Sequence, residues 1–519
     1  MSAETVRLLT PEIVLIAVAV AIFVAGAFAD APKWFRWIAG AGVALSAVAL
    51  WMQHGAAVCS GPLTIDSLAY YGRWLALVLG ALFVLLTARP LAGGGTPEYV
   101  GSLLLAIAGL MLVSGAGELV LMFVGLELIS IPTYVLLYLG RRDAASQESA
   151  VKYFLLSILA SAILLYGLGF LYGTTGSTEL GEIHAALAGS RPALPDAGAV
   201  PVGFDMFARL ALVLIFAGLG FKIAAAPFHF YAPDVYQGTT QANAALLSVV
   251  PKAAGMVALV RILVLAMPGL EAFAWKLALV MAVLTMTLGN FMALWQNNLR
   301  RLLAYSSIAH AGYMLIGLTV GLAPAIVRGS QDGVGALLFY LCVYALATVG
   351  AFAVLEYLGR EDAPIDAVDE LAGLGRARPL VAAAMSVFLF SLAGIPLLAG
   401  FWGKFALFLS ALGVDPGGVS VRPWFVGLAI VGALNAAVAA AYYLRIVGVM
   451  FFRTPLAVPK AEGGMGPWLT FTVCAVLTLA IGAFPRPLLQ AANDASRQSS
   501  VQRAAPDLPP VELAGRTGP

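Results

Sequence analysis

Long runs of apolar residues, separated by short polar connections, dominate the hydrophobic pattern of the chain. Each run approaches about 20 residues, the length that an α-helix needs to cross the hydrocarbon core of a bilayer. The pattern predicts an all-α polytopic membrane protein with about fourteen transmembrane helices. These spans are predicted at 11–29, 34–53, 68–88, 99–116, 117–139, 150–173, 206–231, 240–266, 273–295, 302–323, 333–358, 379–411, 424–452 and 467–486.

Two of these spans are interrupted by residues that break helices at membrane depth. Span seven contains Ala226-Pro227-Phe228-His229 after Lys222, and span twelve contains Gly394-Ile395-Pro396 before Lys404. Proline removes a backbone donor and glycine destabilises a helix, so such backbone persists in a membrane only where protein covers it or it lines a polar cavity. Each break has a lysine beside it, and paired broken helices indicate a transport path.

The positions of the two breaks also predict how the chain is divided. If spans four to eight and nine to thirteen form two five-helix units, each break falls in the fourth helix, and the odd helix number makes the units inverted repeats. We expect an N-terminal three-helix segment at 1–98, the repeats at 99–266 and 267–452, and helix fourteen at 453–486. The Ser-, Gln-, Pro- and Ala-rich tail at 487–519 is expected to be disordered.

The distribution of basic residues predicts the orientation in the membrane. Connections after even-numbered spans carry Arg191, Arg328 and Arg422, whereas those after odd-numbered spans carry twelve basic residues: Lys33, Arg36, Arg89, Arg141, Arg142, Arg300, Arg301, Arg360, Arg376, Arg378, Arg453 and Lys460. Cytoplasmic loops are enriched in Lys and Arg, so both termini are expected on the periplasmic side. The first span runs directly into others, which favours a retained helix over a cleaved signal peptide.

The composition supports the membrane assignment and excludes several functions. Of 519 residues, 61% are hydrophobic and 11% charged, against roughly a quarter charged in soluble domains. The net charge of +2 provides no basic field for nucleic acid. The three cysteines form no CxxC pair, and the chain has no HExxH, P-loop or strand-framed GxGxxG motif, so we expect no nucleotide, metal or redox cofactor in this chain.

The few charges at membrane depth are the candidate functional residues. Placing a charge at the bilayer centre costs roughly 2.5–3.5 kcal/mol, and such residues are functional by default. Four of them are strong candidates, namely Glu127, Lys222, Lys252 and Lys404. A structural ion pair between Glu127 and a lysine is the alternative interpretation. One acid with several lysines suits protons better than Na⁺, because a charged lysine repels cations and can itself exchange a proton.

Other ionisable residues have weaker support. Lys152 lies four residues after Glu148 near the start of span six, a spacing that is common for a surface ion pair. His310 and His229 are titratable partners, and His310 could equally be a core residue bonded to a hydroxyl. Residues close to span ends, such as Arg261, are explained by anchoring at the membrane interface.

Two motifs carry a resemblance to a known family. The stretches from Phe221-Lys222 through Pro227 to Tyr236, and from Asp369 through Gly394-Ile395-Pro396 to Lys404, resemble the antiporter-like membrane subunits of respiratory complex I, the bacterial proton-pumping NADH-quinone oxidoreductase. The resemblance extends from span one to span fourteen. Lys404 departs from the M-type branch, which usually has glutamate there, and no long lateral helix of the L type follows span fourteen, which leaves the N-type branch.

The resemblance implies specific roles and partners. Glu127 matches the fifth-helix glutamate, Lys222 its paired lysine, Lys252 the central lysine and Lys404 the lysine of the far half-channel, while Glu148 and Lys152 match positions at the start of helix six. It implies proton translocation in the bacterial inner membrane, with NADH, FMN, iron–sulfur clusters and quinone used by other subunits of the complex. A subunit of a multisubunit Na⁺/H⁺ antiporter, which shares these motifs, and a passive membrane scaffold are the alternatives.

The strength of the Glu127–Lys222 interaction limits how the relay can work. Two unit charges ~10 Å apart at an effective dielectric near 20 interact by about 1.7 kcal/mol. Moving a proton against ~150 mV costs about 3.5 kcal/mol. One such pair is too weak alone, so either several charges switch in sequence or the local dielectric is lower.

Overall fold

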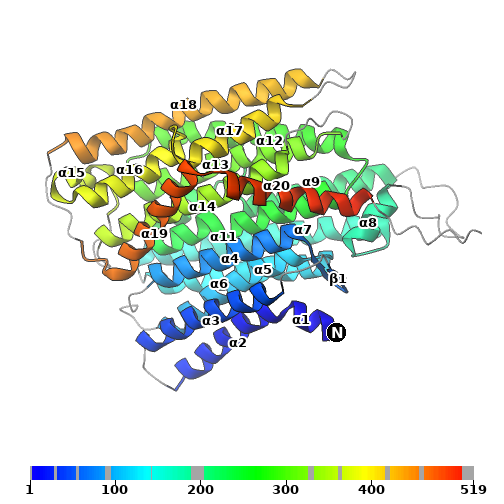
Figure 1. Ribbon diagram of the computed structural model, residues 1–519, viewed down its shortest axis with the longest axis horizontal. Coiled ribbons are helices and arrows are strands. Elements are labelled where there is room, and N and C mark those ends of the chain that lie inside the picture. The colour runs from blue at the N-terminus through cyan, green and yellow to red at the C-terminus, as the bar shows by residue number, and fades with distance from the viewer. Residues whose placement is uncertain are drawn as a thin grey trace, which may run out of the picture.

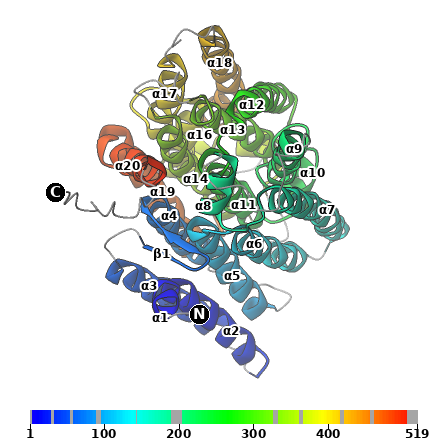
Figure 2. The ribbon, with the colours of Figure 1, turned by 90° about the vertical axis from the view of Figure 1, so that its right-hand side faces the viewer.

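The computed structural model describes residues 3–28, 32–53, 58–87, 95–141, 143–188, 204–324, 332–359, 365–414, 421–454 and 461–504. Long helices lie side by side with their axes roughly aligned (Figure 1). Seen along these axes, α2 (Thr10–Gly26) and α3 (Pro32–Met52) form one edge of the bundle, and α18 (Arg422–Phe452) lies at the opposite edge (Figure 2). The remaining long helices are α4 (Ser67–Leu86), α5 (Thr96–Gly115), α6 (Leu119–Gly140), α7 (Ala144–Thr175), α9 (Phe204–Lys222), α11 (Gln241–Leu259), α12 (Glu271–Leu294), α13 (Leu299–Gly321), α14 (Gly333–Leu358), α16 (Pro379–Ala393), α17 (Ala399–Leu412), α19 (Met465–Ala483) and α20 (Arg486–Ala504).

Shorter elements connect these helices. A hairpin of β1 (Val58–Ser60) and β2 (Leu63–Ile65) pairs Cys59 with Thr64 in antiparallel register and precedes α4. The π-helix η1 (Val260–Ala266) continues α11. The other short elements are α1 (Ala3–Leu8), α8 (Leu180–Leu187), α10 (Ala232–Gly238), the 3₁₀ helix η3 (Val368–Leu371) and α15 (Leu374–Ala377).

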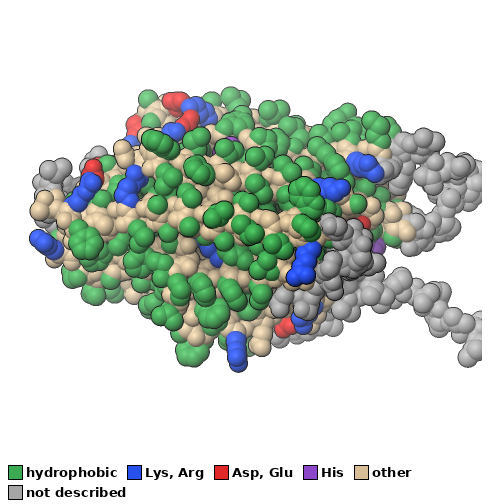
Figure 3. Space-filling view, turned by 90° about the horizontal axis from the view of Figure 1, so that it is seen from above, with side chains coloured by type: hydrophobic (Ala, Val, Ile, Leu, Met, Phe, Trp, Pro, Cys, Tyr) green, Lys and Arg blue, Asp and Glu red, His purple; other side chains and the backbone are tan. Residues whose placement is uncertain are grey.

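The prediction of an all-α polytopic membrane protein is confirmed. Among the described residues, eleven helices are long and apolar enough to cross a membrane, and α2, α16 and α17 are shorter apolar helices. Every predicted span coincides with a helix or with a helix pair, and span twelve is the pair α16 and α17. Hydrophobic side chains cover most of one face of the molecule (Figure 3), as expected for a surface in contact with lipid. The inverted repeats stay a prediction.

Four helices form the interior of the bundle. Nearly all residues of α5, α11, α13 and α14 are buried, although each is long and apolar enough to be a membrane span. A helix that is hydrophobic on all sides is surrounded either by other helices or by lipid. The burial of these four helices shows that other helices surround them. Polar side chains on α11, α13 and α14 are therefore shielded from both water and lipid.

The expected disorder of the tail is wrong over residues 487–504, where α20 forms. Leu488, Leu489, Ala492 and Ala495 recur at helical spacing and make one apolar face. Ala492 and Ala495 are buried, and α20 packs against α14 and α4. The polar composition masked this face, because most of the remaining positions are Ser, Gln, Asn, Asp and Arg. Residues 505–519 lie outside the described part of the chain.

Two buried ion pairs join the N-terminal helices to the bundle. Arg73 Nε lies 2.7 Å from Glu12 Oε1 with both side chains buried, although the two atoms are not aligned as a hydrogen bond. Arg261 Nη2 donates to Asp66 Oδ1 at 2.7 Å, and its Nε donates to the Ser114 carbonyl at 2.8 Å. The expectation that Arg261 anchors the chain at the membrane interface is therefore wrong. Arg261 is buried, and Asp66 at the start of α4 compensates its charge.

The Glu12–Arg73 pair yields a stability prediction. Removing one partner of a buried pair leaves an uncompensated charge and costs about 3–5 kcal/mol, whereas apolar replacement of both is often neutral. We expect Glu12→Leu to lower the thermal unfolding temperature of the detergent-extracted protein, measured by circular dichroism, and Glu12→Leu/Arg73→Leu to restore most of it. Equal losses in the single and double variants would contradict this role for the pair.

Candidate functional site

The first helix break is stabilised by side chains that satisfy its backbone. α9 ends at Lys222, Ala224 adopts a left-handed φ of 55°, and the Ala226–Pro227 peptide bond is cis. Ala226 N donates to Thr285 Oγ1 at 2.9 Å, and the Tyr231 hydroxyl donates to the Phe221 carbonyl at 3.0 Å. Irregular backbone at membrane depth requires such partners from protein. The break thus holds Lys222 at the end of a helix inside the bundle.

Lys222 lies in a polar pocket formed by α6 and α7. Its Nζ is 3.4 Å from Glu127 Oε1 and donates to Ser130 Oγ at 2.6 Å. Two hydroxyls of α7 complete the pocket, Ser161 at 3.2 Å and Ser157 at 3.3 Å from Nζ. Ser161 in turn donates to Glu127 Oε1 at 2.5 Å. The lysine side chain is 2% exposed and the glutamate 20%, so the structure brings this predicted pair together in a mostly enclosed site.

Lys252 occupies a different environment in the centre of the bundle. Its Nζ donates to both the carbonyl and the hydroxyl of Ser307 on α13, the hydroxyl at 2.5 Å. The Nζ also lies 5.2 Å from the centre of the Tyr344 ring, a cation–π distance. Within the described ranges, no acid is within ion-pair distance of Lys252. Gly255, one turn after Lys252 on α11, faces the Lys222 side chain. The two lysines therefore both lie next to the contact between α9 and α11.

The second break holds Lys404 against the carboxyl end of a helix. Lys404 Nζ donates to the carbonyls of Leu392 and Ala393, each at 2.9 Å, which belong to the last turn of α16. The last carbonyls of a helix lack partners within it and carry partial negative charge, so they favour a cation. Gly394 has φ +90°, and a Cβ there would lie 3.0 Å from Lys404 Cδ. Glycine therefore permits both the turn and the lysine. Leu397 in the same break has φ 73°.

His310 lies between Lys252 and Lys404, within a group of tyrosines. Its Nδ1 is 2.6 Å from the Tyr340 hydroxyl and its Nε2 is 3.0 Å from the Tyr443 hydroxyl. The Tyr344 ring, which contacts Lys252, has its centre 5.0 Å from that of His310. The Tyr313 ring is 5.8 Å from His310 and 4.7 Å from Lys404 Nζ. One continuous cluster thus joins the two lysines through the histidine.

These tyrosines were not identified from the sequence. Tyr340 and Tyr344 are four residues apart on α14, and Tyr313 follows His310 by three on α13. Residues at these spacings share a helix face, so Tyr313, on the face of the predicted histidine, was a usable signal, whereas Tyr340 and Tyr344 lie on another helix. Tyr443, whose hydroxyl also bonds Ser306, comes from a distant helix and had no local signal.

The remaining predicted residues lie away from this cluster. Lys152 Nζ pairs with Glu148 at 2.7 Å and with Asp234 at 3.3 Å, and the lysine side chain is 42% exposed. Partial burial would raise the pKa of Asp234, but hydrogen bonds from Arg301 and Lys152 outweigh it and lower that pKa. His229 is half-buried in the first break, and its Nδ1 lacks a hydrogen-bond partner in the described part of the chain. Glu148 and Lys152 therefore belong to a surface ion-pair cluster.

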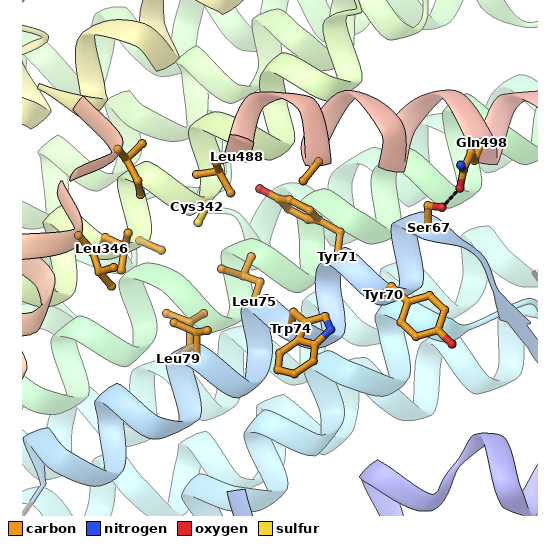
Figure 4. A pocket seen from close by; sticks show the side chains of 15 residues that line it. Ser67, Tyr70, Tyr71, Trp74, Leu75, Leu79, Cys342, Leu346, Leu488 and Gln498 are labelled. Carbon is orange, nitrogen blue, oxygen red and sulfur yellow. Dashed lines mark hydrogen bonds between the residues drawn. The ribbon is translucent and has the colours of Figure 1, made fainter. Parts of the chain in front are cut away.

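A large apolar groove lies apart from the lysines. It has a volume of about 750 Å³ and lies between α4, α14, α19 and α20. Apolar side chains such as Leu75, Leu79 and Leu346 form its walls, and the Ser67–Gln498 hydrogen bond lies at one end (Figure 4). No charged residue lines this groove.

Comparisons with known proteins identify the family. The family model described as NADH:quinone oxidoreductase/Mrp antiporter, TM, matches residues 116–430, which include all four principal site residues. The Mrp complex from Dietzia sp. contains a chain with a TM-score of 0.76 at 21% identity, covering 97% of this chain and 99% of that one, which shows a shared fold. These matches place the fold in the antiporter-like transmembrane class.

Relatives of higher sequence identity identify the family within this class. NADH-quinone oxidoreductase subunit N of Trichlorobacter lovleyi is 36% identical, over 95% of this chain and 97% of the relative. Its counterpart in Rhizorhabdus wittichii is 37% identical, over 95% and 98%. A chain of respiratory complex I from Thermus thermophilus has a TM-score of 0.75 at 34% identity, covering 93% of this chain and 99% of that one. The chain belongs to the family of NADH-quinone oxidoreductase subunit N.

The hydroxyls around His310 generate a test of the cluster. Tyr340→Phe and Tyr443→Phe each remove the partner of one imidazole nitrogen, and we expect proton transport to fall by about a hundredfold, the low end of the range for a lost proton-transfer group. Tyr357→Phe, near the other end of α14, is the matched control. The measurement is the membrane potential that inverted vesicles generate. Unchanged transport in both variants would exclude these hydroxyls from the proton path.

Proposed function

We propose that this chain translocates protons as the subunit N of a respiratory NADH:quinone oxidoreductase. The observation that carries the proposal is the enclosed Lys222–Glu127 pair beside a helix break, within a chain of the subunit N family. Ionisable groups at membrane depth are expensive, and proton pathways are a principal use of them. The redox reaction takes place on other subunits of the complex.

The proton relay passes from Lys222 through Lys252 and His310 to Lys404. Support comes from the shared Tyr344 contact of Lys252 and His310 and from the shared Tyr313 contact of His310 and Lys404. Water bridges the step between Lys222 and Lys252, for which no direct hydrogen bond is found among the described residues. Glu127 controls when Lys222 holds its proton.

The observed separation changes the energetics of the Glu127–Lys222 switch. At 3.4 Å and an effective dielectric near 20, two unit charges interact by about 5 kcal/mol. A proton moved against ~150 mV requires about 3.5 kcal/mol. Breaking or forming this single pair is therefore of the right size to drive one proton step, whereas a pair ~10 Å apart was too weak.

The orientation and the internal repeats are part of the proposal. Basic residues at the ends of odd-numbered spans, such as Arg300 and Arg301 at the start of α13, support a cytoplasmic location for that end of the bundle and a periplasmic location for both termini in the bacterial inner membrane. The two breaks, one before α10 and one between α16 and α17, support inverted repeats over 99–266 and 267–452.

NADH, FMN, iron–sulfur clusters and quinone are assigned to the other membrane and peripheral subunits. The relatives are by name subunits of a NADH-quinone oxidoreductase, which supports such partners. A subunit of a multisubunit Na⁺/H⁺ antiporter is the second candidate, supported by the fold shared with the Mrp complex. Co-purification with flavin- and iron–sulfur-bearing subunits favours the first candidate, and Na⁺-dependent transport without NADH favours the second.

Alanine substitution of the four principal residues tests the proposal. In the assembled complex, we expect Glu127→Ala, Lys222→Ala, Lys252→Ala and Lys404→Ala each to lower quinone-coupled turnover and membrane potential by at least about tenfold, since each removes a proton carrier or its control. Lys276→Ala, an exposed lysine on α12, is the control. If all four variants assembled and pumped normally, the relay would be excluded, and a passive scaffold would be the better interpretation.

A further inference from the structure

One face of α6 carries a line of polar side chains from the middle of the helix to its end. Glu127, Ser130, Tyr134 and Tyr138 follow one another at intervals of three or four residues and so share a helix face. With a rise of 1.5 Å per residue, Glu127 lies about 20 Å and Tyr134 about 9 Å from the last residue of α6, Gly140. The line thus leads from the Lys222 pocket toward one end of the bundle.

α7 presents complementary residues to this face. Ser157 and Ser161, which bind Lys222, occupy one stretch of α7, and Gln147 lies near its first residue. The two helices pack against each other, and the Tyr134 ring meets the Phe154 ring edge-on at 5.2 Å between centroids. A line of polar side chains between α6 and α7 therefore begins at Lys222. The Tyr134 and Phe154 rings separate it from the adjoining ends of the two helices.

An open groove lies on the other side of these rings. It has a volume of about 370 Å³ and is lined by Tyr134, Tyr138, Gln147, Ala150, Val151 and Phe154. The Tyr138 side chain is 62% exposed. At ~30 Å³ per molecule, the groove has room for roughly ten waters. Its polar residues, Tyr138 and Gln147, lie toward the end of the bundle where α6 ends and α7 begins.

The Tyr134 hydroxyl lies between the groove and the Lys222 pocket. It is buried and has no hydrogen-bond partner in the described part of the chain. The hydroxyls of Ser157 and Ser130, which both bind Lys222, lie next to it, and Glu127 is its neighbouring charge. A buried hydroxyl without a partner is costly, so one that persists calls for a function or a water. Because the hydroxyl is shielded from solvent, it meets water in the groove when the Tyr134 ring rotates toward it.

We propose that protons reach Lys222 laterally, from water in the α6–α7 groove through the Tyr134 hydroxyl. This inference rests on the proposed function of Lys222 as a proton carrier. A hydronium ion in the groove gives its proton to the Tyr134 oxygen, while the O–H proton of Tyr134 passes to Ser157 Oγ. The O–H proton of Ser157 passes to the lone pair of neutral Lys222 Nζ, so each hydroxyl gains one proton and loses one. The ring closes the path to bulk water when no proton is passing.

Removing the Tyr134 hydroxyl tests the path. In the intact complex, we expect Tyr134→Phe to slow NADH-driven proton pumping by about a hundredfold, because the ring remains and the relay atom is lost. The rate should also become limited by proton supply and fall as the pH on the groove side rises from about 6 to 8. A variant with only a structural defect would not acquire this pH profile. Tyr172→Phe, an exposed tyrosine near the last residue of α7 and outside the groove, is the control and should pump normally.

The outcomes separate this inference from the proposed function. Normal pumping by Tyr134→Phe together with loss in Lys222→Ala would overturn the lateral path and leave the relay intact. Normal pumping by Lys222→Ala would instead overturn the relay on which the path rests. A loss in Tyr172→Phe equal to that in Tyr134→Phe would also overturn the specific role of the Tyr134 hydroxyl.

Accessibility gives a readout that does not depend on activity. We expect a cysteine in Gln147→Cys to react with a charged, membrane-impermeant methanethiosulfonate added on the groove side, because the groove holds water. Ile131→Cys, exposed on α6 but outside the groove, should stay unreactive because it faces lipid. The unsubstituted chain, with its own cysteines, gives the background. Equal reactivity at the two positions would overturn the water-filled groove.

Discussion

The structure depends on the requirement that every charge and every free backbone group inside a membrane finds its partner within the protein. Lys222 satisfies it with Glu127 and three serine hydroxyls, and Lys404 satisfies it with the last carbonyls of α16. The two lysines are thus stabilised differently, one by a countercharge and one by a helix end. The helix breaks are what bring these partners within reach.

The two modes of stabilisation imply different functions for the two ends of the relay. The Glu127–Lys222 pair contains a countercharge that can move, so its interaction can be switched by a change of only a few ångströms. The carbonyls around Lys404 are fixed by the backbone of α16 and cannot switch without moving that helix. In the proposed relay, control of proton movement would therefore be concentrated at Lys222, and Lys404 would be a stationary site that receives and releases a proton.

Much of this arrangement could be predicted from the sequence. A bilayer imposes a minimum length on apolar segments, so the membrane spans could be predicted. Lys222 and Lys404 could be identified because charged residues are rare within such spans. Pairing between distant helices was not readable. Nothing local to Arg73 indicates that Glu12 compensates it, and Arg261 looked like an interface residue until Asp66 was found beside it. The 3.4 Å separation of Glu127 and Lys222 could not be predicted for the same reason.

The central claim is that the Glu127–Lys222 pair controls proton movement. The most direct test is the number of protons pumped per NADH by reconstituted complex carrying Glu127→Gln/Lys222→Met, which removes both charges together and leaves no buried charge unpaired. The account predicts normal assembly with a reduced proton-to-electron ratio or an arrested turnover. Assembly with an unchanged ratio and unchanged turnover would contradict it.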